Sequence, residues 1–197
     1  MSVIQMTALK VAFIWHKHQP WYLWPGSRQA ALPFVRLHAC GAYYDMPWLL
    51  RGFDKTTVTF NLVPSLTEQM ARYARAETTD RALELSRRAA ADLEPDERHY
   101  LLTCFSNYRA NARPQGRGRC AELRRKCRDA GATLTEADWR DLQVWLNLAW
   151  CGYALRSDSE VVRELLAKEK GFSEQEIRSQ LPSRSTWIGR MLDLFRS

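Results

Sequence analysis

The sequence predicts an α/β fold that begins with two parallel strands and continues as a mostly helical segment. Two stretches, residues 11–15 and residues 56–63, have the length and the β-branched or aromatic content of strands. A helical pattern follows each stretch, and right-handed connection through a helix makes successive strands parallel. After about residue 76 only helical patterns remain. Because two strands cannot bury the faces of a sheet, the chain is expected to be an incomplete domain.

The first strand ends in the most distinctive stretch of the chain. Its apolar run at residues 11–15 turns directly into His16-Lys-His18-Gln19-Pro, and the proline ends the strand because it lacks a backbone N–H. Residues two apart on a strand point to the same face, so His16 and His18 are expected to present their imidazoles side by side. Trp21 follows on a loop. Polar groups and aromatic rings at the carboxyl end of a buried strand are typical of a ligand site.

Spacing alone leaves three chemistries open for the two histidines. The pair can form a hydrogen-bonded strand end, contact a ligand, or share a zinc ion. Zinc requires three or four ligands, and the other histidines, His38 and His99, have no spacing that would supply them. We therefore expect neither a metal nor a cofactor.

The second strand leads into a helix. Residues 56–63 form the strand, and the helix runs through residues 66–74, with Ser65 and Glu68 at the spacing of a capping box. This spacing explains Glu68 by capping alone. Asn61, near the strand end, is expected to make a structural hydrogen bond.

The segment between the two strands and the chain after them complete the prediction. Residues 32–39 have the spacing of extended chain and residues 40–53 that of a helix, which contains Pro47. Asp45 is expected to be a surface carboxylate. Further helices are predicted over residues 79–93, 96–108, 120–130, 136–155, 158–168 and 173–180.

Capping signals support two of these helices. Thr135 and Ser173 stand at N-cap positions, with Asp138 and Glu176 three residues further on. The helix at residues 136–155 is the most apolar and is expected to be buried.

Composition limits the classes of protein. The chain has 197 residues, 46% of them hydrophobic and 26% charged, which is typical of a globular protein with one core. It has no apolar run of membrane-spanning length, and because its first residues lack the basic start, apolar core and cleavage site of a signal peptide, none is expected. Five cysteines at irregular spacing predict free thiols in a reducing cytoplasm.

The net charge of +7 raises the question of a nucleic-acid partner. Much of this charge is concentrated in the basic cluster at residues 109–128. Surfaces that bind single strands interleave aromatic rings with their cations, and this cluster has none within it. We favour a solvated loop and helix face there, with nucleic-acid binding kept as an alternative.

Four stretches in the same order resemble glycoside hydrolase family 57, the α-amylase and 4-α-glucanotransferase group. The first is the His-X-His-Gln-Pro motif after the apolar strand. The other three are residues 32–39 with 43–46, residues 58–66, and residues 141–150. The resemblance extends from about residue 10 to about residue 176.

The resemblance implies a distorted barrel of seven strand–helix units and a retaining mechanism, with a glutamate nucleophile and an aspartate acid on later strands. Neither signature is present in this sequence. The resemblance also implies that His16, His18 and Gln19 contact sugar, with Trp21 as an aromatic platform where tyrosine is usual. The expected organisation is a leader at 1–9, the first part of the barrel at 10–76, a helical segment of the same catalytic domain at 77–180, and a divergent tail at 181–197.

We therefore expect the amino-terminal fragment of a retaining glycoside hydrolase acting on α-glucans, without catalytic residues of its own and inactive alone. Its expected partners are an α-glucan or maltooligosaccharide and the missing carboxy-terminal part of the same enzyme. A non-catalytic α-glucan-binding module remains an alternative, as does a nucleic-acid-binding protein acting through residues 109–128.

Overall fold

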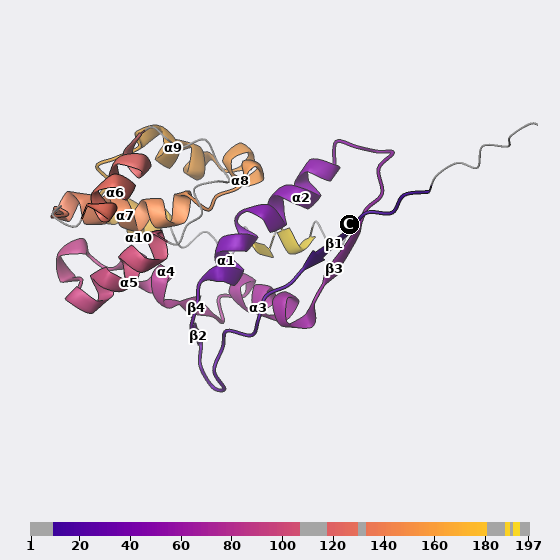
Figure 1. The fold of residues 1–197 in the computed structure, drawn as a ribbon, viewed down its shortest axis with the longest axis horizontal. Coiled ribbons are helices and arrows are strands. Elements are labelled where there is room, and N and C mark those ends of the chain that lie inside the picture. Colours follow the sequence, from indigo (N-terminus) through magenta and orange to yellow (C-terminus); the bar gives the residue numbers. More distant parts are fainter. Residues whose placement is uncertain (1–9, 107–117, 130–132, 181–187, 190, 194–197) are drawn as a thin grey trace, which may run out of the picture.

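The computed structural model describes residues 10–106, 118–129, 133–180, 188–189 and 191–193, and Figure 1 shows their arrangement. Helices α1, α2 and α3 accompany strands β1 and β3 in one part, and the later helices gather in the other. In chain order the elements are β1 (Ile14–Lys17), β2 (Gln29–Ala30), α1 (Phe34–Ala39), α2 (Ala42–Leu50), β3 (Thr59–Leu62), α3 (Pro64–Ala74), β4 (Thr79–Asp80), α4 (Arg81–Arg87), the 3-10 helix η1 (Ala90–Asp92), α5 (Pro95–Ser106), α6 (Arg119–Arg128), α7 (Glu136–Leu148), α8 (Tyr153–Asp158), α9 (Glu160–Lys168) and α10 (Glu174–Gln180).

The two predicted strands pair as expected. β1 and β3 run parallel, with His16 opposite Asn61 in the register. A second parallel pair joins β2 to β4, so the prediction that no strand follows residue 76 is wrong. These strands are two residues long, too short to leave an alternating pattern in the sequence.

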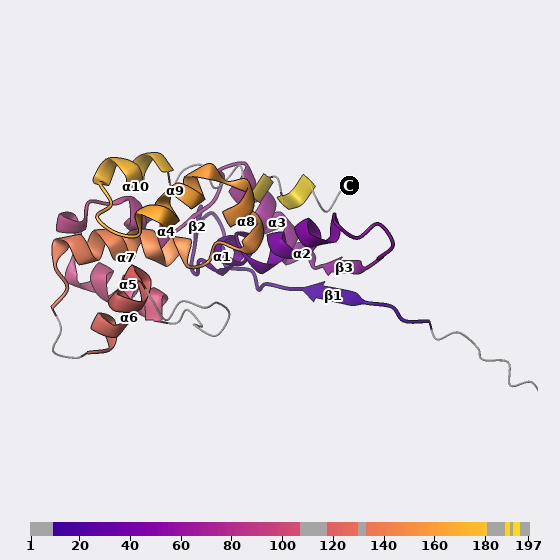
Figure 2. The same ribbon diagram turned by 90° about the horizontal axis from the view of Figure 1, so that it is seen from above.

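The prediction that the first strand is buried is also wrong. Val11 and Ile14 are 64% and 66% exposed, and the strand extends to Lys17 rather than ending at Trp15. Helices α1, α2 and α3 lie on one side of the strand pair (Figure 2). On that side Trp15 contacts Phe60 edge to face, with ring centroids 5.2 Å apart. The strand has the composition of a buried one, but within the described residues only one face of the pair is covered.

Two helix predictions need correction. Residues 32–39 are not extended, because Phe34–Ala39 forms α1. This short helix buries most of its residues, so its apolar positions have no helical stripe to reveal it. The predicted helix at 136–155 is two helices, α7 and α8, separated at Gly152.

The capping box at Ser65 is a further correction. Helix α3 begins at Pro64, whose missing N–H is harmless in a first turn, and no side chain caps it. Ser65 Oγ donates instead to Gln19 O at 2.8 Å. Glu68 forms an ion pair with Arg72 at 2.8 Å.

The other two capping predictions are confirmed. Thr135 and Asp138 exchange both bonds of a capping box at the start of α7. Ser173 Oγ accepts from the Glu176 N–H at 3.2 Å, and the Glu176 carboxylate accepts from the Ser173 N–H at 2.7 Å. Lys168, bonded to the same carboxylate, is the main reason that the pKa of Glu176 falls to about 2.

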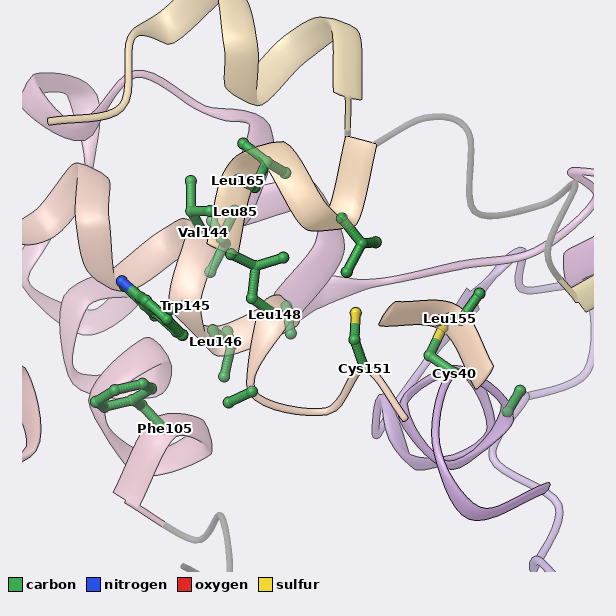
Figure 3. Packing of buried hydrophobic residues seen from close by; sticks show 14 of the residues in the cluster. Cys40, Leu85, Phe105, Val144, Trp145, Leu146, Leu148, Cys151, Leu155 and Leu165 are labelled. Carbon is green, nitrogen blue, oxygen red and sulfur yellow. The ribbon is translucent and has the colours of Figure 1, made fainter. Parts of the chain in front are cut away.

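Helix α7 is the centre of the helical part, as its apolar composition predicts. Figure 3 shows its Trp145, Leu146 and Leu148 among Phe105 of α5 and Leu165 of α9. The buried cluster continues through Cys151 and Cys40 toward the strand part of the chain.

A glycine makes the contact between the two parts possible. Gly152 N donates to Cys40 O at 2.7 Å, and Ala154 N donates to Asp45 Oδ1 at 2.8 Å. A Cβ atom at Gly152 would lie 2.1 Å from Asp45 Oδ1, so no larger residue fits without a shift. The prediction that Asp45 is a surface carboxylate is therefore wrong, because it joins α2 to the start of α8.

A buried ion pair joins the elements at the middle of the molecule. Arg36 of α1 and Asp80 at the N-terminus of α4 are 1% and 0% exposed, with Arg36 Nε 2.5 Å from Asp80 Oδ2. Arg36 Nη2 donates to Asp80 Oδ1 at 2.9 Å and Nη1 donates to Asn147 Oδ1 of α7 at 2.9 Å. Burial alone would lower the pKa of Arg36, but the Asp80 charge outweighs burial and raises it.

The first prediction concerns this pair. Replacing Asp80 with asparagine keeps an oxygen that can accept from Leu83 N but leaves the Arg36 charge buried without its counter-ion. We expect Asp80→Asn to lower the free energy of unfolding by about 3–5 kcal/mol, measured by urea denaturation. The control is Asp96→Asn at the exposed Arg81–Asp96 pair, with an expected loss of about 0.5 kcal/mol or less. Equal losses in the two variants would contradict the argument.

Lys17 is buried on the covered face of the strand pair. Its side chain is 3% exposed, and Nζ donates to Tyr43 O at 3.1 Å. The ammonium also lies 5.0 Å from the Tyr43 ring centroid and 4.9 Å from that of Phe60. Burial lowers the pKa of Lys17 to about 8, although the nearby Asp45 opposes the shift.

The second prediction is a dependence of stability on pH. Folded Lys17 loses its proton near pH 8 while the unfolded lysine keeps it to about pH 10.4, so the unfolded state binds more protons between these values. The contribution of Lys17 to the free energy of unfolding should therefore rise with pH in this window, by about 1–3 kcal/mol. Urea denaturation at pH 7.5 and 9.5, compared between the wild type and Lys17→Met, isolates this change from other titrating groups. Parallel pH profiles of the two proteins would be evidence against it.

Candidate functional site

The site lies at the carboxyl ends of β1 and β3, on the uncovered face of the strand pair. His16 and His18 are exposed there, and their rings stack with centroids 6.1 Å apart and planes 24° apart. Asn61 stands opposite His16 in the register and is also exposed. The sequence prediction that the two imidazoles share one face is confirmed. We call His16, His18 and Asn61 the open polar face.

Gln19 does not share this exposure. It is 8% exposed and lies between two tyrosines. Its Nε2 donates to the Tyr43 hydroxyl at 3.0 Å, and its Oε1 accepts from the Tyr22 hydroxyl at 2.9 Å. Burial is the main cause that raises the pKa of both tyrosines, so both hydroxyls stay protonated at neutral pH.

Two tryptophans follow the motif on the loop. Trp21 is 47% exposed, and the Arg72 guanidinium lies 5.4 Å from its ring centroid. Trp24 is 74% exposed at a turn in which Ser27 N donates to Trp24 O and Gly26 has a φ of +77°. The sequence predicts this turn but does not single out Trp24. The signal is the position of Trp24 directly before Pro25-Gly26, which makes it the first residue of a turn, where side chains are commonly exposed.

A row of half-buried rings, which the sequence analysis missed, leads from this loop toward α7. His38 lies near its middle, with its ring 5.6 Å from that of Tyr43 and 5.1 Å from that of Trp150. Phe34 links Tyr22 to His38, at 6.3 Å from each. Burial lowers the pKa of His38, which keeps its imidazole neutral at pH 7. Phe34 and His38 are four residues apart on α1, but the other rings come from other parts of the chain, so the row as a whole leaves no sequence pattern.

Metal binding has no further support from the described residues. Among them, no three or more His, Cys, Asp or Glu side chains gather as metal ligands would. The two imidazoles can donate and accept hydrogen bonds and can make ring contacts.

The basic cluster at residues 109–128 is partly structural where it is described; residues 107–117 lie outside the described part. Arg119 Nε donates to Asp141 at 2.7 Å and Nη2 donates to Asp138 at 2.8 Å. Lys126 Nζ donates to Asp138 at 2.9 Å. Burial opposes ionisation of Asp138, but these cations and Thr135 outweigh it and hold its pKa well below the usual range. Arg119 and Lys126 are therefore engaged in ion pairs with carboxylates of α7.

None of the described helices combines the length and the apolar character that crossing a membrane would require.

Comparison with known families agrees with the motifs. The family model described as glycosyl hydrolase family 57 matches residues 12–197 of the 197-residue chain. The match includes the open polar face and continues beyond residue 176, where the resemblance of individual motifs ends. The comparisons with curated proteins and with solved structures found no match. Because the family model covers nearly the whole chain, the chain belongs to glycosyl hydrolase family 57.

Proposed function

We propose that this chain is the amino-terminal part of a retaining glycoside hydrolase acting on α-glucans, and that it binds the glucan at the open polar face. The observation that carries the proposal is the stacked pair His16 and His18, exposed at the carboxyl ends of parallel strands in a member of this family. Ligand sites of α/β proteins lie at this end of the strands.

The side chains suit a sugar ligand. A neutral imidazole offers one donor and one acceptor, and the Asn61 amide offers both, which matches the mixed character of sugar hydroxyls. Trp21 supplies an exposed ring against which a sugar ring can stack, and the Arg72 guanidinium lies 5.4 Å from its centroid. In this proposal His16, His18 and Trp21 contact the glucan. Gln19 is buried next to them and is bonded to Tyr22 and Tyr43.

The catalytic carboxylates are proposed to lie outside this chain. Retaining hydrolysis needs two carboxyl groups about 5–5.5 Å apart on either side of the bond. Two carboxylates that follow the motif, Asp45 and Glu68, are engaged by Ala154 N and by Arg72. One face of the strand pair is uncovered, which supports the proposal that a carboxy-terminal part of the enzyme is the partner of this chain. In this proposal residues 10–76 and 77–180 are pieces of one catalytic domain.

The proposed location is the cytoplasm. All five cysteines are free thiols, and three of them, Cys40, Cys120 and Cys151, are buried. Burial is the main cause that raises the pKa of Cys120, to about 11, so this thiol stays protonated and unreactive. A reducing compartment suits such a set.

The third prediction tests the glucan site. Each of His16→Ala and His18→Ala removes hydrogen bonds to the sugar, worth about 0.5–1.5 kcal/mol apiece, so maltoheptaose should bind roughly threefold to tenfold more weakly. Isothermal titration calorimetry measures this. The control is His99→Ala, an exposed histidine on α5 far from the strands in sequence, which should bind as the wild type does.

The same proteins test the catalytic part of the proposal. The chain alone should not release reducing sugar from soluble starch. Robust turnover by the wild-type chain alone would place the catalytic carboxylates inside it and overturn that part. A wild type that shows no heat on titration with millimolar maltoheptaose would overturn the glucan site itself.

A further inference from the structure

The segment just after β1 is bonded to the buried side-chain amide of Gln69. Gln69 of α3 is 0% exposed. Its Nε2 donates to Pro20 O at 2.8 Å, and its Oε1 accepts from Tyr22 N at 2.9 Å. Its Nε2 also donates to Ser65 O at 2.7 Å, so both ends of the amide are occupied by backbone groups. Burial of such a group is favourable only because these bonds are made.

The same segment is held from α2 by Tyr43. Its hydroxyl donates to His18 O at 3.1 Å and accepts from Gln19 Nε2 at 3.0 Å. Its backbone carbonyl accepts from Lys17 Nζ at 3.1 Å. One residue of α2 therefore contacts three successive residues at the end of β1.

These contacts begin where the strand ladder stops. β1 ends at Lys17, and its carbonyl accepts the last bond from the β3 side, from Val63 N at 3.3 Å. His18 lies one residue further on, outside the ladder that fixes His16. The His18 carbonyl accepts from the Tyr43 hydroxyl at 3.1 Å. A bond from α2 thus holds the backbone of the residue that carries the second imidazole.

We propose that Tyr43 and Gln69 are positioning residues that hold His18 beside His16 in the geometry that receives the glucan; this rests on the proposed function. Gln69 fixes the backbone at residues 20–22, and Tyr43 fixes the His18 carbonyl. Gln19 is a strut in this frame, between the Tyr43 and Tyr22 hydroxyls, and does not contact the ligand. Its 8% exposure and its two tyrosine bonds distinguish it from the exposed histidines.

The chain offers a closely matched pair of variants. Tyr43→Phe removes the hydroxyl that holds His18. Tyr44→Phe, at the next position of the same helix, removes a hydroxyl that donates to Asp158 at 3.1 Å, away from the motif. Tyr43→Phe loses the hydroxyl's bonds to His18 and Gln19, and Tyr44→Phe loses the bond to Asp158, so both variants should unfold at a lower temperature than the wild type.

The fourth prediction is that only Tyr43→Phe alters the imidazole pair. Two-dimensional NMR of the full chain should show shifted His18 ring signals in Tyr43→Phe and wild-type signals in Tyr44→Phe. Binding of maltoheptaose, measured by calorimetry, should weaken roughly threefold to tenfold in Tyr43→Phe alone, which corresponds to one hydrogen bond. A merely structural role would move the two variants together.

Unchanged His18 signals in a folded Tyr43→Phe would overturn the positioning role. A wild type that does not bind maltoheptaose would refute the proposed function, while the ring signals would still decide the positioning. Should Tyr43→Phe fail to fold, Tyr22→Phe removes the opposite support of the Gln19 strut, and the same shift of the His18 signals is expected. If the His18 signals did not shift in Tyr22→Phe, the positioning role would be contradicted there as well.

Discussion

The buried pair of Arg36 and Asp80 is the constraint on which the rest of the structure depends. Removing two charges from water is costly, and this pair offsets the cost with two parallel bonds between guanidinium and carboxylate. The remaining capacity is used as well, because Tyr73 donates to Asp80 and Asn147 accepts from Arg36. Four elements, α1, α3, α4 and α7, therefore have one relative position in which all these groups are satisfied.

This constraint reaches the open polar face through short connections. Helix α1 passes into α2 at Gly41, where a Cβ atom would lie 2.9 Å from Trp150 O at the end of α7. The start of α2 is thus held against the helical part, and Tyr43 lies in its first turn. The ion pair in the middle of the molecule and the hydroxyl that contacts His18 belong to one continuous chain of contacts.

Local features of this fold could be predicted from sequence, and features that depend on distant residues could not. The positions of the two strands, the capping box at Thr135 and the shared face of the imidazoles follow from neighbouring residues, and the parallel pairing follows from the helical connection between the strands. Arg36 shows the limit, because a lone arginine among apolar residues is by default expected at the surface. Its partner is 44 residues away, and nothing near either residue signals the pair. The bonds of Gln69 to the motif and the exposure of Ile14 could not be predicted either, because they too depend on residues distant in the sequence.

The uncovered face of the strand pair changes from apolar to polar along the strands, and this gradient bears on where the proposed carboxy-terminal part would pack. At its amino end stands Ile14, 66% exposed, and toward its carboxyl end stand His16, Asn61 and His18. Covering an isoleucine side chain is favourable by about 1.5–3 kcal/mol, whereas covering unpaired imidazole and amide groups is costly. A further layer of protein is therefore stabilised over the amino end and disfavoured over the carboxyl end. A carboxy-terminal part that packed in this way would leave the imidazoles accessible, which is what the proposed glucan site requires.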